Sequence, residues 1–332
     1  MGKTTIKPKD PEQITQLTIC IPAYHAADTI VDTLRSLQIQ TDKRFKVLVI
    51  LDGPEDEEQE KLLRVASSYE DLDLSYVLQK ENGGCGHARN VGLDNCTTRY
   101  IAYLDADDLY MPYAVDQINQ AIAYHFDWYA GKFLQRVRNG YIIRGNEHNT
   151  WCHGRVYNVD FLKYHNIRFP DQNRIADDFP FNILCREFGV EVREGDLPIA
   201  IYRPATGSAT RADDAQQKQA YEYIKGNMHF VRTAMRERSA DKLVQLPQVL
   251  VMSYFYADYA CWKGWDCWKS MEEDFKELCR YVNLTKLMQD ERFMYTLKQG
   301  LLIPARPYPD IAEPPRETFW DMLSRLGIRE VE

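Results

Sequence analysis

The stretch from residue 100 to residue 108 constrains the fold of this chain most strongly. Residues 100–104 are the apolar, β-branched and aromatic types that form buried strands. Three carboxylates follow at once, on Asp105, Asp107 and Asp108. Like charges this close repel each other, so such a cluster calls for a cation or a hydrogen-bonding ligand. A solvated acidic turn after a core strand is the alternative that the triplet alone leaves open.

The residue types of this cluster indicate which ion would bind. In an open α/β sheet, ligands collect at the carboxyl ends of the strands, where these side chains would lie. Carboxylate oxygens suit Mg²⁺ or Mn²⁺, which complete their coordination with water and phosphate oxygens. The sequence therefore predicts Mn²⁺ or Mg²⁺ as a cofactor.

The first hundred residues alternate between strand and helix patterns. Strands are expected over residues 17–21, 45–51 and 74–78, and Asp28 is expected to cap the first helix. This alternation predicts a parallel, doubly wound sheet. The glycine fingerprint of dinucleotide-binding domains is missing after the first strand, and no P-loop occurs, so both of those classes are disfavoured.

A glycine-rich loop precedes the acidic stretch. Gly83, Gly84 and Gly86 lead into a helical pattern that contains Arg89. Glycines let backbone N–H groups approach a ligand closely, and a diphosphate would satisfy both those amides and the guanidinium. A plain tight turn explains the loop alone equally well. Together with the strand that ends in carboxylates, the loop indicates a nucleotide whose phosphates lie between a metal and the amides.

A second acidic pair, Asp177 and Asp178, precedes another helix. Its apolar face is expected to pack on the core and consists of Phe181, Leu184, Cys185 and Phe188. Favourable interaction with the helix dipole would explain the two aspartates without any function. The remaining expectations before residue 211 are a helix over 112–125, hairpin strands over 128–137 and 141–144 joined by Asn139-Gly140, and a strand over 198–202.

From residue 211 the pattern changes to helices. Residues 216–238, 247–268 and 271–281 have helical patterns with no strand signal between them, and a short final helix is expected over 318–326. Aromatic side chains are dense in the second of these segments. The sequence predicts a helical C-terminal region that packs on the preceding domain.

Composition narrows the class of protein. With 332 residues, one large or two moderate domains are expected. A net charge of −8 argues against a general polyanion-binding surface, so nucleic acid is not the default partner. Eight cysteines without a Cys-x-x-Cys pair suggest free thiols in a reducing compartment. No signal peptide and no apolar run of roughly 18 residues is evident, which predicts a cytoplasmic protein without a membrane span.

Several motifs, in their order along the chain, resemble those of glycosyltransferase family 2, whose members are inverting enzymes with the GT-A fold. The matching residues are Ile21-Pro22-Ala23-Tyr24, Asp52-Gly53, Asn82-Gly83-Gly84, Ala88 to Leu93, Tyr103 to Asp108, Asp177-Asp178 with Phe181, and Tyr202-Arg203 with Ser208. The resemblance covers about residues 17–210. It implies a Rossmann-like, mostly parallel sheet flanked by helices over 17–210, after a flexible N-terminus (1–16). The helical region over 211–332 could contact the acceptor or a second copy of the chain.

The resemblance also implies a role for individual residues. Asp105 and Asp107 match the Asp-x-Asp motif that binds the ribose and the metal ion. Asp178 matches the general base and Asp177 its neighbour. The residues expected to hold the nucleotide-sugar donor, from the resemblance or from the patterns above, are Pro22, Ala23, Tyr24, Asp52, Gly84, Gly86, Arg89, Asp105 and His153.

Two positions depart from the family pattern. His25 stands where the family more often has asparagine, so contacts to the base would differ. Pro204 and Ala205 stand where many relatives have a histidine that completes the metal site. Water or His153 could take that place, and His153 could instead orient the acceptor or a phosphate.

These features predict an inverting glycosyltransferase that moves a sugar from a nucleotide-diphosphate sugar, typically a UDP-sugar, to an acceptor hydroxyl. Direct displacement at the anomeric carbon needs a base for the hydroxyl and stabilisation of the departing diphosphate, and the two acidic sites would supply both. A sugar-phosphate nucleotidyltransferase and a non-catalytic carbohydrate-binding module are the alternatives. A lipid-linked glycan, a protein and a modified nucleobase in DNA all stay open as acceptors.

Overall fold

The computed structural model describes residues 15–54, 56–145, 150–171, 176–204, 215–302 and 317–328. The N-terminus up to residue 14, Ala205, Ser208 and the stretch 303–316 lie outside these residues. The chain forms two compact units. The first comprises residues 1–174 and 188–206, and the second comprises residues 175–187 and 207–332.

The first unit is built on one sheet, with strands in the order β3-β2-β1-β4-β8-β6-β9-β5 and with β7 paired to β6. The strands are β1 (Leu17–Ala23), β2 (Lys46–Leu51), β3 (Leu74–Leu78), β4 (Tyr100–Tyr103), β5 (Leu109–Tyr110), β6 (Trp128–Val137), β7 (Gly140–Arg144), β8 (Arg155–Asn158) and β9 (Val192–Tyr202).

The half of the sheet that comes first in the sequence is parallel throughout, as the alternation of strands and helices predicts. β1 pairs in parallel with both β2 and β4, and β2 pairs in parallel with β3. All seven residues of β1 are buried, which explains why its sequence is continuously apolar. β1 does not end at Ile21 as expected but continues through Pro22 to Ala23, where Asp52 N donates to Ala23 O at 2.9 Å.

The other half of the sheet is mixed. β8 is antiparallel to both β4 and β6, β5 is antiparallel to β9, and β6 and β9 are parallel. The four-residue β8 gives too short a signal to be expected from sequence. β9 begins before the expected residue 198. The sequence does not predict its first half, because that half is exposed, mostly polar and without an apolar period.

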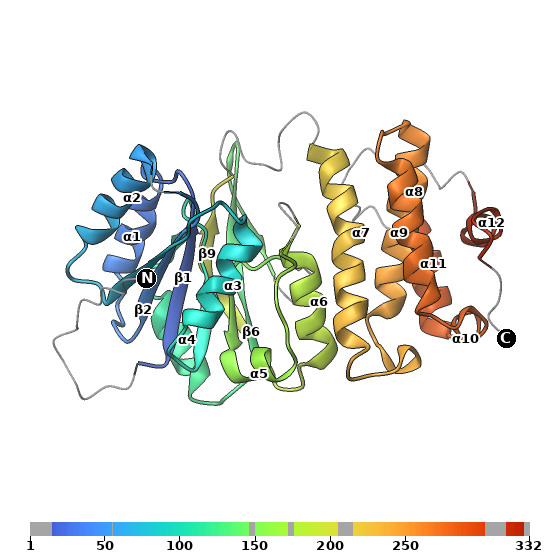
Figure 1. Cartoon of the computed structure of the whole chain (residues 1–332). Helices are drawn as coiled ribbons and strands as arrows, with labels where there is room; N and C mark the ends of the chain where they lie inside the picture. Colours follow the sequence, from blue (N-terminus) through green and yellow to red (C-terminus); the bar gives the residue numbers. More distant parts are fainter. Residues whose placement is uncertain are drawn as a thin grey trace. The chain divides into compact units, whose positions relative to one another are not determined.

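Helices cover the parallel strands on both faces. Figure 1 shows α1 and α2 on one side of β1 and β2, and α3 on the other. The N-cap position of the first helix is held by Thr29, whose side chain makes no capping hydrogen bond, and not by the expected Asp28. The helix expected over 112–125 is shorter. The helices of this unit are α1 (Ile30–Gln38), α2 (Glu57–Ser67), α3 (Cys85–Asn95), α4 (Ala114–Ile122) and α5 (Val159–Tyr164).

The second unit is helical over its described residues. α7, α8, α9 and α11 lie side by side with nearly parallel axes (Figure 1), and Tyr254, Phe275 and Phe293 each contact the Phe319 ring of α12. Its helices are α6 (Asp178–Phe188), α7 (Ala215–Ala234), the 3-10 helix η2 (Ala240–Lys242), α8 (Leu246–Lys263), α9 (Trp268–Arg280), α10 (Leu284–Met288), α11 (Glu291–Leu302) and α12 (Phe319–Arg325).

Two further expectations can be compared with the structure. None of the eight cysteines, all of which lie in the described residues, is part of a disulfide. Within the described part of the chain, no helix has both the length and the apolar character needed to cross a bilayer.

A buried carboxylate fixes the end of α6 within the second unit. The Glu187 side chain is fully buried, and it accepts hydrogen bonds from Arg238 Nη1 and from the backbone N of Gln245, each at 2.8 Å. We expect Glu187→Ala to lower the free energy of unfolding by about 3 kcal/mol, because the Gln245 amide would lose its acceptor and Arg238 would lose its ion pair, keeping only the backbone carbonyl of residue 187. Urea denaturation followed by circular dichroism measures this change.

Glu277→Ala is the matched control. Glu277 pairs with Arg232 on the surface of the same unit, where both side chains are more than one-third exposed. Loss of this ion pair should lower the free energy of unfolding by less than about 1 kcal/mol. Equal losses in the two variants would contradict the role given to Glu187.

Candidate active site

The acidic stretch after β4 forms a tight turn. Asp108 N donates to Asp105 O at 3.0 Å and closes the turn. Thr33 of α1 holds this turn in place, because its hydroxyl donates to the carbonyls of Ala106 and Asp108 at 3.0 and 2.8 Å. The carboxylates thus stand on a backbone that is held by the helix after β1.

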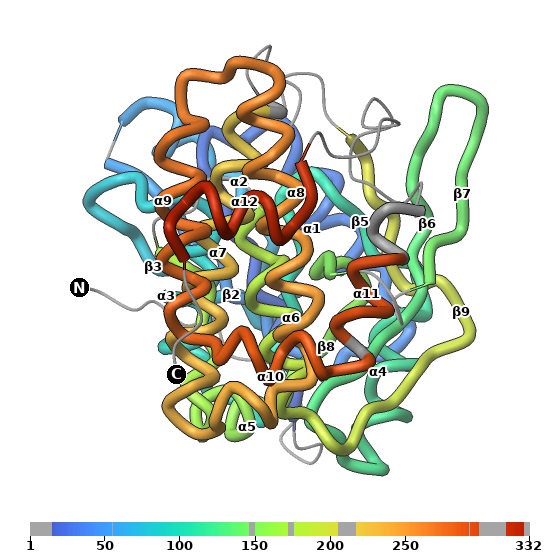
Figure 2. The backbone as a smooth tube through the Cα atoms, turned by 90° about the vertical axis from the view of Figure 1, so that its right-hand side faces the viewer, coloured from blue at the N-terminus to red at the C-terminus, as the bar shows by residue number. Residues whose placement is uncertain are grey.

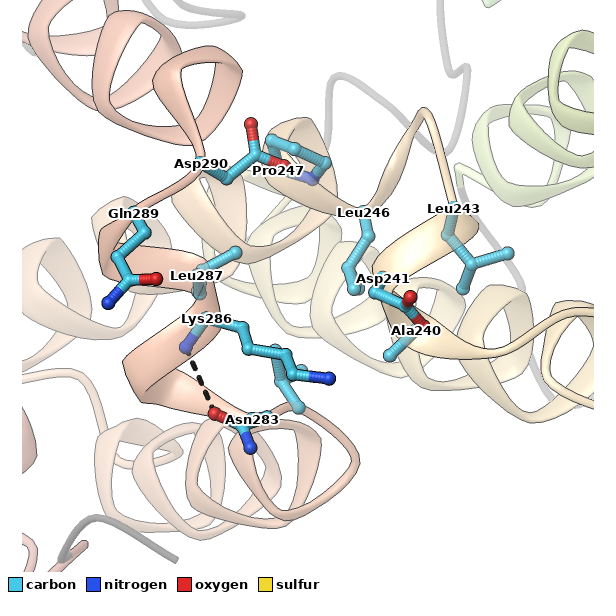
Figure 3. A pocket seen from close by; sticks show the side chains of 11 residues that line it. Ala240, Asp241, Leu243, Leu246, Pro247, Asn283, Lys286, Leu287, Gln289 and Asp290 are labelled. Atoms are coloured by element: carbon cyan, nitrogen blue, oxygen red, sulfur yellow. Dashed lines mark hydrogen bonds between the residues drawn. The ribbon is translucent and has the colours of Figure 1, made fainter.

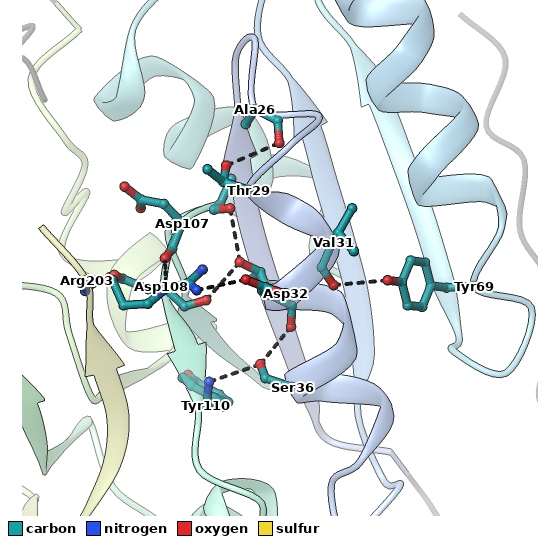
Figure 4. A network of polar contacts seen from close by, with 12 residues as sticks. Ala26, Thr29, Val31, Asp32, Ser36, Tyr69, Asp107, Asp108, Tyr110 and Arg203 are labelled. Carbon is teal, nitrogen blue, oxygen red and sulfur yellow. Dashed lines mark hydrogen bonds and ion pairs between the residues drawn. The ribbon is translucent and has the colours of Figure 1, made fainter. Parts of the chain in front are cut away.

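Arg203, which follows β9, holds the same turn from the other side. Its backbone N donates to Asp108 Oδ1 at 2.7 Å, and its Nε donates to the carbonyl of Asp107 at 2.5 Å. Its Nη1 pairs with Asp32 Oδ2 at 3.0 Å (Figure 4). A single arginine therefore connects the acidic turn, β9 and α1.

Asp105 is paired with Arg89, the buried arginine of α3. Arg89 Nη2 lies 2.8 Å from Asp105 Oδ1, and the guanidinium lies over the ring of Phe169 at 5.3 Å. Burial works to raise the pKa of the Asp105 carboxyl, but Arg89 and then His153 outweigh it, so the pKa lies below the ordinary value. Asp105 is therefore ionised at neutral pH.

His153 lies beside the same carboxylates. Its Nε2 is 2.9 Å from Asp108 Oδ2 and 4.0 Å from Asp105 Oδ2. Burial raises the pKa of the Asp108 carboxyl, and the contact with His153 offsets part of that effect. The His153 ring packs against Phe133 and Tyr202 with centroids 5.2 and 4.6 Å away, which fixes its orientation.

One ligand atom each from Asp105, Asp108 and His153 lie within 4.8 Å of one another, as a metal site requires. Two carboxylates and one imidazole suit Mn²⁺ well, whereas Mg²⁺ prefers oxygen ligands alone. A small hollow of about 10 Å³, enough for roughly one water molecule, adjoins these three residues. The donor set and the space are consistent with a small cation and its water.

The Asp107 carboxyl also has a raised pKa, because the nearby Arg203 offsets only part of the effect of burial and of the neighbouring carboxylates. Burial raises the pKa of the Asp107 carboxyl to about 6, and the carboxylates of Asp108 and Asp105 contribute to the rise. An added cation would relieve this repulsion. Asp107 stays a predicted metal ligand, beside the cluster of Asp105, Asp108 and His153.

The glycine-rich loop is held by Asp52, at the end of β2. The Asp52 carboxylate is buried and accepts from Gly83 N at 2.9 Å and from Gly84 N at 2.8 Å. Two of the loop amides thus have an acceptor within the chain, and the expectation that this loop faces a diphosphate stays a prediction. Gly84, with φ of 89°, is the N-cap residue of α3, and Gly86 is buried in the first turn of that helix.

Tyr24 and His25 follow β1 at the same edge of the sheet. Their rings stack with centroids 4.0 Å apart, and Tyr24 is 46% exposed. His25 Nε2 lies 3.0 Å from Asp56 Oδ2, and Asp56 caps α2. A side chain at Gly53 would come within 2.8 Å of the Tyr24 ring, so glycine permits this approach. The pair offers a flat, accessible ring next to Asp52.

The second acidic pair belongs to the other unit. Asp178 is the first residue of α6 and is partly exposed, whereas Asp177 is buried. Asn182 Nδ2 donates to the carbonyl of Asp178 at 2.9 Å, and Phe179 contacts Tyr223 of α7. The sequence correctly predicts the helix and its apolar face. The convergence of Asp178 with Asp105 on one cleft stays a prediction.

A hollow of about 300 Å³ occurs within the second unit (Figure 3). Its walls come from η2, the start of α8 and the α10 region, and none of the residues predicted for the donor or for catalysis lines it. Leu243, Leu246 and Leu287 form much of the wall, with Lys286 and Asp241 among the polar side chains.

The sequence assigns no individual role to three residues that the structure brings into the site. Asp108 belongs to the acidic stretch, but the Asp-x-Asp motif assigns the metal to Asp105 and Asp107 alone. Arg203 is part of a matching motif without a role of its own, and no pattern singles out Asp32. No local signal connects Arg203 with Asp32, because 171 positions separate them.

Comparison with known proteins decides the family. A family model described as "Glycosyl transferase family 2" matches residues 18–187, which is just over half of the chain. The chain belongs to glycosyl transferase family 2. The match includes all predicted site residues, from Pro22 to Asp178.

Named relatives of this family 2 chain align over only part of their length. An uncharacterized glycosyltransferase of Rickettsia conorii, RC0461, is 31% identical over 40% of this chain and 23% of the relative. Teichoic acid poly(glycerol phosphate) polymerase of Staphylococcus epidermidis is 27% identical over 51% of this chain and 25% of the relative. The chain thus spans about a quarter of the length of these two relatives.

Solved structures share the fold of this family 2 chain. TarS 1-349 of S. aureus aligns with a TM-score of 0.53 and 16% identity over 86% of this chain and 88% of that chain. The mannosyltransferase PcManGT of Pyrobaculum calidifontis, in complex with GDP-Man and Mn²⁺, aligns with a TM-score of 0.52 and 16% identity over 91% and 90%. This likeness concerns the fold alone, and it confirms the predicted α/β class of the GT-A type with C-terminal helices.

The geometry of Asp52 gives a stability prediction for this family 2 chain. In Asp52→Asn, an amide NH₂ would face one of the two loop N–H groups, so one buried donor would lose its acceptor. We expect the free energy of unfolding to fall by about 2 kcal/mol. Urea denaturation measures it, with the exposed Asp71→Asn as a control that should change it by less than about 0.5 kcal/mol. A D52N chain as stable as the parent would contradict this assignment.

Proposed function

We propose that this protein is an inverting glycosyltransferase that transfers a sugar from a nucleotide-diphosphate sugar, most simply a UDP-sugar, to an acceptor hydroxyl. The observation that carries the proposal is the grouping of Asp105, Arg89 and His153 at the carboxyl end of β4 in a family 2 chain. Such a group combines an ionised carboxylate for a cation with a fixed guanidinium for an anion.

The donor site would extend along the carboxyl ends of three neighbouring parallel strands. Ala23, Asp52 and Asp105 follow or end β1, β2 and β4, so they share one edge of the sheet. The exposed Tyr24 ring would stack on the base, and Pro22 and Asp52 would shape the ribose side. Gly84 and Gly86 would bring the start of α3 close to the diphosphate.

A divalent ion fits the residues present. Asp105 would hold it, with Asp107, Asp108 or His153 completing the protein ligands, and Mn²⁺ is favoured over Mg²⁺ by the imidazole. When bound, such an ion neutralises charge on the diphosphate of the donor. Arg89 would add a second positive charge on the same side, and the rings around His153 would keep that edge of the site dry.

Asp178 is proposed as the general base. It would take the proton of the acceptor hydroxyl while that oxygen attacks the anomeric carbon and the bond to the diphosphate breaks, so one displacement inverts the anomeric centre. Asp177 would support Asp178 at the start of α6. In this proposal the catalytic domain covers residues 17–210, and the helical region over 211–332 contributes to acceptor binding or to contact with a second copy.

The choice of UDP rests on fold neighbours. TarS 1-349 was solved in complex with UDP-GlcNAc, and the same fold in PcManGT was solved with GDP-Man and Mn²⁺. Both donors join a sugar to a nucleoside diphosphate. We infer a donor of this class for the present chain and place UDP-sugars first.

A donor screen tests the proposed reaction. Purified protein is incubated with a panel of UDP- and GDP-sugars with and without Mn²⁺, and release of the nucleoside diphosphate is measured. We expect one donor to be cleaved in a Mn²⁺-dependent way. Asp178→Asn should retain binding of that donor and lose at least about a hundredfold in turnover, which is the lower range for loss of a general base.

Other results of the screen would assign another function. Release of inorganic pyrophosphate from a nucleoside triphosphate and a sugar phosphate would indicate a nucleotidyltransferase. Binding of carbohydrate without turnover would indicate a binding module. Unchanged turnover in Asp178→Asn would remove that residue from the mechanism, and turnover without any divalent ion would remove the metal role of Asp105 and Asp107.

The raised pKa of Asp107 predicts how Mn²⁺ binding depends on pH. A protonated carboxyl cannot bind the ion, so as pH falls below about 6 the dissociation constant should rise by up to about tenfold per unit from this group. Isothermal titration calorimetry between pH 7.5 and 5 measures it. Asp107→Asn should weaken binding at neutral pH and flatten this dependence.

Asp108→Asn separates the two candidate sets of ligands. If Asp108 and not Asp107 binds the ion, Asp108→Asn should abolish Mn²⁺ binding while Asp107→Asn leaves it unchanged, which would contradict the expectation for Asp107. The exposed Asp71→Asn serves as the control that leaves binding intact.

A further inference from the structure

A narrow hairpin extends from the sheet of the first unit. β6 and β7 pair antiparallel, with Val137 opposite Gly140 beside the turn. β6 runs in the same direction as β4, because β8 is antiparallel to both. The hairpin therefore projects from the sheet edge that carries Asp105. Figure 2 shows β6 and β7 as a ribbon that reaches beyond the other strands.

The outer strand of this hairpin exposes three large apolar side chains in a row. Tyr141, Ile142 and Ile143 are 57%, 42% and 62% exposed. Over the described residues, β7 pairs with β6 alone. A strand that meets only water normally carries polar residues, so consecutive exposed apolar residues indicate a surface that something covers.

Cations surround these apolar residues. Arg136, Arg138 and Arg144 are exposed, and Lys132 is partly exposed. The sequence from residue 128 to residue 145 contains no aspartate or glutamate, although the whole chain has a net charge of −8. The hairpin is a local positive region on an acidic protein.

The strand register mixes apolar and cationic side chains on both faces of the hairpin. Tyr141 is opposite Arg136 and Ile143 is opposite Leu134, so these four share one face. Ile142 lies between them in sequence and points to the other face, as does Arg144. Neither face is purely apolar or purely charged.

We propose that the β6–β7 hairpin docks this protein on an anionic membrane surface. Tyrosine and isoleucine would enter the boundary between headgroups and acyl chains, while the arginines contact lipid phosphates with their stems along the apolar layer. A soluble polyanion would engage the arginines and leave the apolar residues in water. A second copy paired along β7 would bring like charges together. The membrane matches both features at once.

Vesicle cosedimentation tests this proposal on the full chain. The vesicles contain phosphatidylcholine alone or phosphatidylcholine with phosphatidylglycerol in equal parts. We expect binding to the anionic vesicles only, weakened by added salt. Arg136→Gln/Arg138→Gln should lower the partition coefficient about 25-fold, at about fivefold per arginine. Tyr141→Ser/Ile143→Ser should also lower it at least tenfold.

Controls keep the result specific. Arg35→Gln/Arg64→Gln removes two exposed charges on α1 and α2, and Tyr164→Ser removes a tyrosine that is 81% exposed on α5. Both should bind vesicles as the parent does. Circular dichroism shows whether each variant folds. Because one hairpin variant removes charge and the other removes apolar side chains, a single folded variant is enough to test vesicle binding by the hairpin. Nucleotide-sugar turnover without vesicles should stay unchanged in both, which separates this surface from the proposed reaction.

Several results would overturn the proposal. These are equal binding to neutral vesicles, no binding to anionic vesicles, or hairpin variants that bind like the parent. Binding to soluble polyphosphate without binding to vesicles would assign the arginines to a polyanion instead. A dimer on size-exclusion chromatography that Tyr141→Ser/Ile143→Ser dissociates would assign the exposed strand to a contact between copies.

Discussion

The repulsion among three carboxylates at the end of β4 is the constraint on which the site depends. The first unit compensates two of them through its own contacts: Asp105 has the guanidinium of Arg89, and Asp108 has His153 and the backbone N–H of Arg203. Asp107 keeps a raised pKa. The pKa of Asp108 is raised as well, so the turn keeps negative charge that its own cations neutralise only in part, as a cation-binding site requires.

The parallel half of the sheet brings the acidic turn together with the other predicted site residues of the first unit. Because β2, β1 and β4 are parallel neighbours, the residues that follow them emerge at one edge. Asp52 fixes the glycine-rich loop there, and α3 starts from that loop and carries Arg89 back to Asp105. The helix α1, which follows β1, also holds the acidic turn through Thr33 and binds Arg203 through Asp32.

The parts that sequence predicted well depend on short-range patterns. The apolar runs of β1 to β4 and the helical periods between them lie within a few residues each, so the parallel half and Asp105 could be inferred directly. The predicted end of β1 is two residues too early, because proline usually interrupts a strand and Pro22 does not do so here. The exposed half of β9 has no apolar period, so its length was underestimated.

The parts that sequence missed depend on contacts between distant residues. The sequence names His153 as a site residue but not its contact with Asp108, which depends on the pairing of β8 with β4. The contact of Arg203 with Asp32 likewise depends on the place of β9 in the sheet. The glycine-rich loop shows a different limit: its composition predicted accessible amides, but a buried aspartate from another strand binds two of them. Composition predicts what a loop can do, and the fold decides which partner it binds.

Crystals of the full chain soaked with Mn²⁺ and UDP would test the central claim most directly, through an anomalous difference map recorded at the manganese edge. The account predicts one strong peak within bonding distance of an Asp105 carboxylate oxygen and of the diphosphate. A manganese peak away from the end of β4, or a diphosphate bound elsewhere with Asp105 still paired to Arg89 alone, would contradict it.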